Sequence, residues 1–183
     1  MLYEGKEIIL KNGITAVIKT PEVRDGGDML RFISTACGET EFLLRSAEDW
    51  TGVSIESEEN WIRSSRDDTR KLILACYVDG KIVGNCEIGF LRGSKENHRA
   101  SIGIAILREY WNLGIGSAMF EILLETAKGS EGTEIVELEY KEGNERGAAL
   151  YKKFGFETVA VIPRAFKMKD GRQVGKFVMQ KIL

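Results

Sequence analysis

The chain has 183 residues, of which 43% are hydrophobic and 30% are charged, and its formal net charge is −2. This size and balance predict one soluble globular domain covering residues 1–183. The slight negative charge argues against nucleic acid as a partner, because phosphate backbones need a basic surface, and no apolar run approaches the roughly 20 residues that cross a membrane.

The N-terminal part predicts a hairpin and two helices. Strands are expected at 8–10 and 14–18, with the turn at Lys11-Asn12-Gly13. Helices are expected at 27–35 and 57–65, the second opening with Ser57. This region therefore begins as a β-hairpin followed by helical cover.

The remaining chain predicts strands interleaved with two further helices. Strands at 72–78 and 81–90 are joined by Asp79-Gly80, which is a strong hairpin signal. The later expected elements are a strand at 99–107, a helix at 115–128, a strand at 134–140, a helix at 144–154, and strands at 157–162 and 174–182. Because a helix separates strand 99–107 from strand 134–140, these two should run parallel.

Gly114-Ile115-Gly116 stands where strand 99–107 gives way to an amphipathic helix. Glycines let a backbone approach a ligand closely, and a helix start presents free N–H groups with partial positive charge. The turn therefore predicts a phosphate site, with a plain strand-to-helix turn as the alternative. A dinucleotide-binding fold fits less well because Met119 occupies the place of the third glycine, and no Gly-Lys-Ser/Thr is present for a P-loop.

Two segments together, 100–117 and 138–156, resemble the GNAT family of N-acetyltransferases, in particular its ribosomal-protein N-terminal and small-amine members. Trp111 to Gly116 matches the family pattern Arg/Gln-x-x-Gly-x-Gly/Ala, with Trp111 in place of the basic or amide residue. The resemblance covers nearly the whole chain. It implies an α/β (α+β) GNAT fold: a mixed, mostly antiparallel twisted sheet of about seven strands, about four helices, and a parallel pair, 99–107 with 134–140, that splays around the cofactor.

The resemblance also implies acetyl-CoA as the acyl donor, without a metal. The backbone amides expected to hold its diphosphate are those of Asn112, Leu113, Gly114, Ile115, Gly116 and Ser117. The strand edge at Ile104, Ala105 and Ile106 would pair with the pantetheine arm. Asn144 would bond to the same arm while it caps the following helix.

Direct transfer to an amine needs a group that takes a proton and a group that gives one. Tyr151, seven residues after Asn144, matches the family's general acid, although ring packing alone is the other interpretation. Glu139 matches the glutamate that acts as base in ribosomal-protein acetyltransferases. Glu137, Glu87 and a water relay stay open as alternatives, and His98 is expected in a surface loop. The N–H of Ile106 would stabilise the oxyanion.

Charge is unevenly distributed along the chain. Residues 39–68 hold nine acidic side chains, whereas residues 164–181 hold six basic ones. An acidic lip would attract a cationic amine, such as a polyamine, an aminoglycoside, a lysine side chain or a peptide N-terminus. A solvated acidic face is the alternative.

The expected function is therefore acetyl transfer to a primary amine of a small molecule or a protein. A non-catalytic module that binds coenzyme A is the alternative from a different class. The family resemblance also allows a homodimer.

Cys37, Cys76 and Cys86 have no metal-ligand spacing, and their odd number favours reduced thiols in the cytoplasm. Charged residues interrupt the first segment, so no secretory leader is expected.

Overall fold

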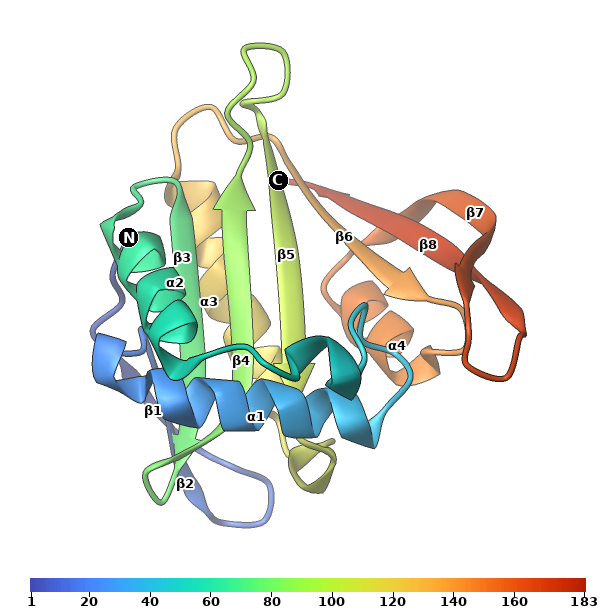
Figure 1. Ribbon diagram of the computed structural model, residues 1–183. Coiled ribbons are helices and arrows are strands. Elements are labelled where there is room, and N and C mark those ends of the chain that lie inside the picture. The colour runs from blue at the N-terminus through green and yellow to red at the C-terminus, as the bar shows by residue number, and fades with distance from the viewer.

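The computed structural model describes residues 1–183, and its eight strands form a single twisted sheet in the order β1-β2-β3-β4-β5-β6-β8-β7 (Figure 1). The strands are β1 (Lys6–Ile9), β2 (Thr15–Lys19), β3 (Lys71–Val78), β4 (Lys81–Phe90), β5 (Arg99–Ile106), β6 (Ile135–Lys141), β7 (Glu157–Lys167) and β8 (Gln173–Ile182). The helices are α1 (Gly26–Glu39), α2 (Ile55–Asp67), α3 (Ile115–Gly129) and α4 (Glu145–Lys153), with short 3-10 turns η1 (Val23–Asp25), η2 (Ala47–Trp50) and η3 (Arg108–Tyr110).

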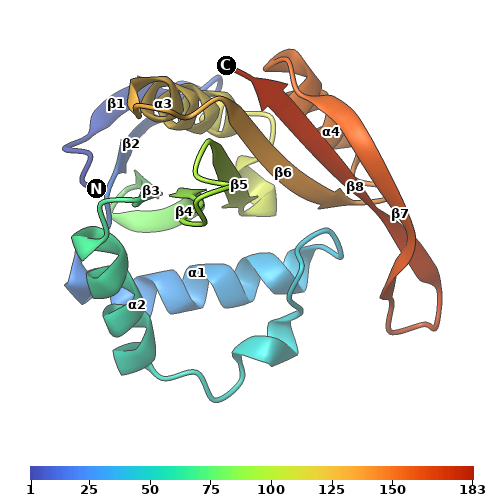
Figure 2. The same ribbon diagram turned by 90° about the horizontal axis from the view of Figure 1, so that it is seen from above.

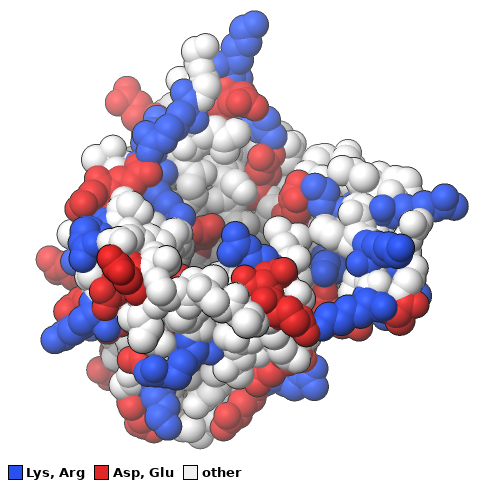
Figure 3. Space-filling view, viewed as in Figure 1, with Lys and Arg blue, Asp and Glu red and all other residues white.

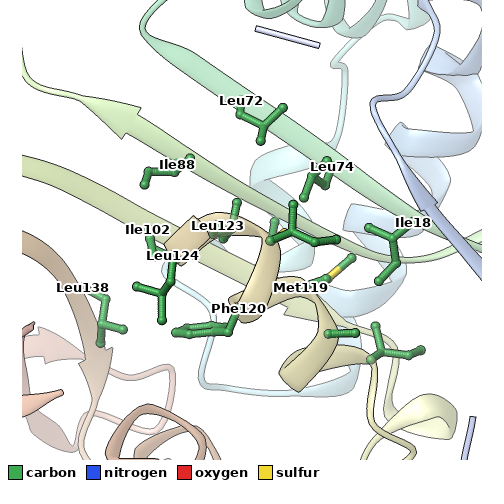
Figure 4. Close-up of a cluster of buried hydrophobic side chains, with 14 of the residues drawn as sticks. Ile18, Leu72, Leu74, Ile88, Ile102, Met119, Phe120, Leu123, Leu124 and Leu138 are labelled. Carbon is green, nitrogen blue, oxygen red and sulfur yellow. The ribbon is translucent and has the colours of Figure 1, made fainter. Parts of the chain in front are cut away.

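Helices cover both faces of the sheet, α1 and α2 on one side and α3 and α4 on the other (Figure 2). Strand β3 shows why, since its sequence is apolar at nearly every position. Leu72 and Leu74 pack into the larger core around α3, while Ile73 and Ala75 pack into the smaller core under α1 and α2. Figure 4 shows the larger core converging on α3.

The sheet opens between β5 and β6. Strands β4 and β5 pair from Gly84–Ile106 through Phe90–Ala100, but β5 and β6 pair in parallel only from Arg99–Ile135 to Ser101–Glu137. The predicted parallel pair and its splay are confirmed. Beyond Ser101 the two strands diverge, leaving one side of β5 without a neighbouring strand.

The backbone of β5 presents alternate residues to this gap. Leu91 N–H donates to the Arg99 carbonyl, and Leu107 N–H donates to the Val83 carbonyl. Bonding alternates along an antiparallel pair, so residues of odd number in β5 face β4. The N–H and C=O groups of Ile102, Ile104 and Ile106 therefore face the gap.

The structure corrects the predicted elements at three places. The eight strands predicted by residue range are all present, one more than the number of about seven that the family resemblance implies. Helix α2 begins after Ser54, whose hydroxyl accepts a hydrogen bond from the Ser57 N–H, so Ser54 and not Ser57 is the cap. Strand β7 continues past Pro163 to Lys167, because it is an edge strand where proline is tolerated and its register shifts between Ile162 and Phe166.

None of the four helices combines the length and the apolar character that crossing a membrane would need.

Candidate active site

A cleft of about 1050 Å³ lies where β5 and β6 diverge. Figure 3 shows a hollow in the middle of this face, with acidic and basic side chains around its rim. Every predicted site residue except Leu113 lines the cleft. Leu113 instead packs against the larger core, and its carbonyl accepts a hydrogen bond of 3.1 Å from the Lys11 N–H.

The start of α3 presents unpaired donors to the cleft. Gly114 adopts φ +105°, which an L side chain rarely adopts, and no side chain caps the helix. The N–H groups of Ile115, Gly116 and Ser117 belong to the first turn and so have no intrahelical acceptor. A Cβ at position 116 would lie 3.1 Å from Leu150 Cδ2, so Gly116 also lets α3 and α4 pack closely.

The open edge of β5 forms one wall. The N–H groups of Ile104 and Ile106 face the gap, as the alternation described above requires. Ala105 differs from the expectation, because the same alternation turns the backbone groups of this odd-numbered residue toward β4. The carbonyl of Ile106 already accepts a hydrogen bond of 2.7 Å from the Trp111 indole N–H. The free donors on this edge are therefore two N–H groups, two residues apart.

Tyr151 and Asn144 come from α4 on the other side of the cleft. Asn144 Oδ1 accepts a 3.0 Å hydrogen bond from the Gly147 N–H, so its predicted capping is confirmed. Tyr151 is 7% exposed, and its ring packs against Phe120 (5.5 Å between centroids) and Tyr140 (5.8 Å). Burial, with a contribution from Tyr140, raises the pKa of Tyr151 to about 12. The phenol is therefore protonated at physiological pH.

Two carboxylates line the cleft on the face that α1 covers. Both oxygens of Glu139 accept hydrogen bonds of 2.8 Å from Lys176 Nζ, and Glu87 pairs with Lys71 Nζ at 2.8 Å. Glu87 lies opposite Gly103 of β5, and a Cβ at that glycine would be 3.9 Å from Glu87 Oε1. The carboxylates thus lie on either side of β5 near the point where the gap opens.

The other groups considered from the sequence lie elsewhere. Glu137 accepts a hydrogen bond from the Arg99 guanidinium and does not line the cleft. His98 precedes β5, and its carbonyl accepts hydrogen bonds from Glu134 and Ile135. Of the acidic residues, Glu139 and Glu87 are therefore the ones placed where a base could act.

The acidic and basic segments noted in the sequence face each other across one end of the cleft. The loop of residues 40–54 meets the β7–β8 hairpin through Glu41–Arg172 (3.3 Å) and Glu48–Lys169 (2.5 Å). Buried Lys141 holds the same loop, because its Nζ donates to the carbonyls of Glu41 and Leu43 at 2.9 Å each. Sequence reasoning missed these contacts, since their partners are about 100 or more residues apart.

The family model for the acetyltransferase (GNAT) family matches residues 39–156, which is more than half of the chain. The chain belongs to the GNAT family. This GNAT protein is also similar to two acetyltransferases of named activity. It is 26% identical over 112 residues to the L-amino acid N-acetyltransferase AaaT of Escherichia coli, covering 61% of this chain and 68% of that relative. It is 36% identical over 95 residues to an N-alpha-acetyltransferase of Sulfurisphaera tokodaii, covering 46% of this chain and 56% of that relative.

Solved structures share the fold of this GNAT protein. A GNAT-family acetyltransferase from Streptococcus pneumoniae superposes with a TM-score of 0.85 at 24% identity, covering 92% of this chain and 99% of that one. YncA from Salmonella typhimurium, solved with its cofactor acetyl-CoA, superposes with a TM-score of 0.78 at 16% identity, covering 92% and 94%. Membership of the acetyltransferase (GNAT) family, and not the shared fold, makes the protein an acyltransferase with acetyl-CoA as its donor.

The residues of this chain suit that donor. The first turn of α3 offers backbone N–H groups and no acidic side chain, as a diphosphate requires. The gap-facing N–H group of Ile104 suits an amide carbonyl of a pantetheine arm, and the N–H group of Ile106 lies two residues further along the same edge. Lys11, Arg146 and Lys153 also line the cleft, so its lining carries positive charge.

Proposed function

We propose that this GNAT protein transfers the acetyl group of acetyl-CoA directly to a primary amine within a ternary complex. The observation that carries the proposal is the arrangement of the cleft. A carboxylate and a buried neutral phenol lie on the same cleft as the unpaired edge of β5. Proton acceptor, backbone donor and proton donor are thus all available where one thioester can reach them.

Each group has one role in the proposed reaction. Acetyl-CoA supplies an acetyl group activated as a thioester. Glu139 takes a proton from the substrate ammonium, so that the free amine can attack the thioester. Glu139 is preferred to Glu87 as the base because β6 borders the gap itself, whereas Glu87 lies one strand further away. The Ile106 N–H donates to the acetyl oxygen as negative charge develops there.

Tyr151 then gives its proton to the departing sulfur. The C–N bond forms first and gives a tetrahedral intermediate; the C–S bond then breaks as the oxyanion collapses, and the sulfur leaves as a thiol with the Tyr151 proton. The second proton of the nitrogen, which the amide must lose, restores the phenol. Burial raises the pKa of Tyr151, but the same apolar surroundings also destabilise the coenzyme A thiolate. Because the tyrosinate and the thiolate are both destabilised, the phenol can still give its proton to the sulfur.

We further propose that the acceptor is a compact amine with an apolar substituent. The acidic loop does not leave Glu41 and Glu48 as unpaired negative charges at the edge of the cleft, because they form ion pairs with Arg172 and Lys169. The wall that this loop and α1 offer to the cleft is largely apolar, lined by Ile33, Phe42, Leu43, Leu44 and Trp50. Both named relatives, an L-amino acid N-acetyltransferase and an N-alpha-acetyltransferase, are consistent with this class.

An acceptor screen tests the proposal by following thiol release from acetyl-CoA. Leucinamide, phenylalanine and peptides with an apolar N-terminal residue should be acetylated with a higher kcat/KM than spermidine or an aminoglycoside. A preference for spermidine would contradict the acceptor class. Binding of coenzyme A without thiol release for any amine would contradict the enzyme and favour a coenzyme A-binding module.

Three expectations from the sequence stay predictions: a single domain over residues 1–183, a cytoplasmic location and a possible homodimer. Sedimentation equilibrium of the purified protein tests the last of these.

A further inference from the structure

Trp111, in the turn between η3 and α3, has two guanidinium groups close to its ring. Arg146 Cζ is 3.1 Å from the centroid of the Trp111 ring, and Arg108 Cζ is 5.4 Å from it. The indole N–H is fixed on the Ile106 carbonyl at 2.7 Å. The ring is therefore held at the edge of the gap, and it links the β5–α3 turn to the start of α4.

The two arginines differ in their partners. Arg108 donates from its guanidinium to the Glu39 carbonyl and from its backbone N–H to Glu39 Oε2. Arg146 lines the cleft, is half-buried, and forms no hydrogen bond or ion pair with any residue of the chain. Arg146 is thus a cation without an anion.

Its location makes this lack of a partner costly. Arg146 lies in the first turn of α4, where the helix dipole disfavours positive charge. Burial and the nearby Arg108 both lower its pKa, which shows that the surroundings oppose its charge. An anion that entered the cleft would relieve these unfavourable terms.

The contact with the Trp111 ring leaves the N–H donors of Arg146 free to bind a ligand. A guanidinium that lies over an aromatic ring uses its flat face, and its N–H donors remain available in its own plane. Trp111 is three residues before Gly114, so these donors are held beside the turn whose backbone N–H groups open α3. Lys153 reaches the same turn, since its Nζ donates to Ser117 Oγ at 2.9 Å.

We propose that Arg146, positioned by the Trp111 ring, binds the diphosphate of acetyl-CoA together with the first-turn N–H groups of α3. The proposal rests on acetyl-CoA as the donor and does not depend on the acceptor or on the catalytic roles of Tyr151 and Glu139. The proposal assigns a phosphate-binding side chain to α4. Arg146 would supply, beside the Trp111 ring, the positive charge that an aromatic residue at position 111 does not carry.

Isothermal titration of the Arg146→Gln variant with coenzyme A and with dephospho-coenzyme A, which lacks the 3′-phosphate, tests the assignment. Loss of a charge-assisted bidentate contact should weaken both ligands by the same factor, roughly 10- to 100-fold. Arg146→Lys keeps the charge and should fall between the wild type and Arg146→Gln.

Arg108→Gln is the matched control, because it removes the same charge from the same ring. It should change the affinity less than about threefold, because the Arg108 guanidinium already donates to the Glu39 carbonyl. Unchanged affinity in Arg146→Gln, or an equal loss in Arg108→Gln, would overturn the proposal. A loss confined to coenzyme A would also overturn it, because the contact would then be to the 3′-phosphate.

Discussion

Replacing Tyr151 by Phe removes one hydroxyl from the cleft and leaves the ring in place. The ring is the part that packs, against Phe120 and Tyr140, and no residue of the protein bonds to the hydroxyl. The substitution therefore leaves no buried partner unpaired, and we expect the free energy of unfolding to change by less than about 1 kcal/mol. Any loss of turnover then reports on chemistry.

The expected loss of turnover follows from the role of the group. A positioned general acid contributes about 10²- to 10⁴-fold to a rate, so kcat for the Tyr151→Phe variant should fall at least about 100-fold, or roughly 2.7 kcal/mol in barrier. The dissociation constant for coenzyme A should stay within about threefold, since the phosphates and the arm are bound elsewhere. Steady-state thiol release and calorimetric titration measure the two quantities.

The pH dependence gives an independent test of the same group. The acid acts in its protonated form, and a pKa of about 12 keeps it protonated at every pH at which the assay is practical. No fall in kcat between pH 7 and pH 10 should therefore be caused by Tyr151. An alkaline limb in this range that disappears in Tyr151→Phe would contradict the buried, neutral phenol.

Tyr140→Phe is the matched control, because it removes a hydroxyl from the adjacent ring, which is tilted against Tyr151. We expect it to lower kcat less than about threefold, within the range of substitutions that remove no catalytic contact. The reasoning is refuted if Tyr151→Phe keeps more than half of the wild-type kcat, or if Tyr140→Phe causes the larger loss.

Three further predictions concern the base, the glycine turn and the loop. Glu139→Gln should lower kcat about 100-fold, whereas Glu87→Gln should mainly raise KM for the amine; the reverse result would make Glu87 the base. Gly116→Val should weaken coenzyme A binding and also lower stability by about 1–3 kcal/mol in a thermal melt, because the added side chain meets Leu150; unchanged stability and affinity together would contradict the close packing. Lys141→Met should speed hydrogen exchange in the 40–45 segment and raise KM for the amine, because the carbonyls of Glu41 and Leu43 lose their donor; unchanged exchange would show that the ion pairs alone hold the loop.

The sequence predicts those parts of the fold that local patterns encode. The strand at 99–107, the glycine turn and the α4 cap at Asn144 each have their signal within a few residues, and each lies where it was expected. The cap of α2 was misplaced because Ser54 and Ser57 are chemically equivalent candidates three residues apart. Local pattern could not choose between them.

The contacts that complete the site depend on the tertiary structure. No local signal relates Arg146 to Trp111, Lys141 to the carbonyl of Glu41, or Lys169 to Glu48. The sequence showed that acidic and basic residues were segregated, but not that the two segments lie against each other. Because that neutralisation removes the free negative charge, we propose a compact amine from among the primary amines that the sequence left open.

A crystal structure of the protein with coenzyme A tests the central claim most directly. We predict the diphosphate on the N–H groups of Ile115 to Ser117, the pantetheine arm within hydrogen-bond distance of the Ile104 N–H group, and the sulfur close to the Ile106 N–H group and within reach of the Tyr151 hydroxyl. A complex in which β5 and β6 pair along their whole length, or in which the ligand lies outside the gap, would contradict the account.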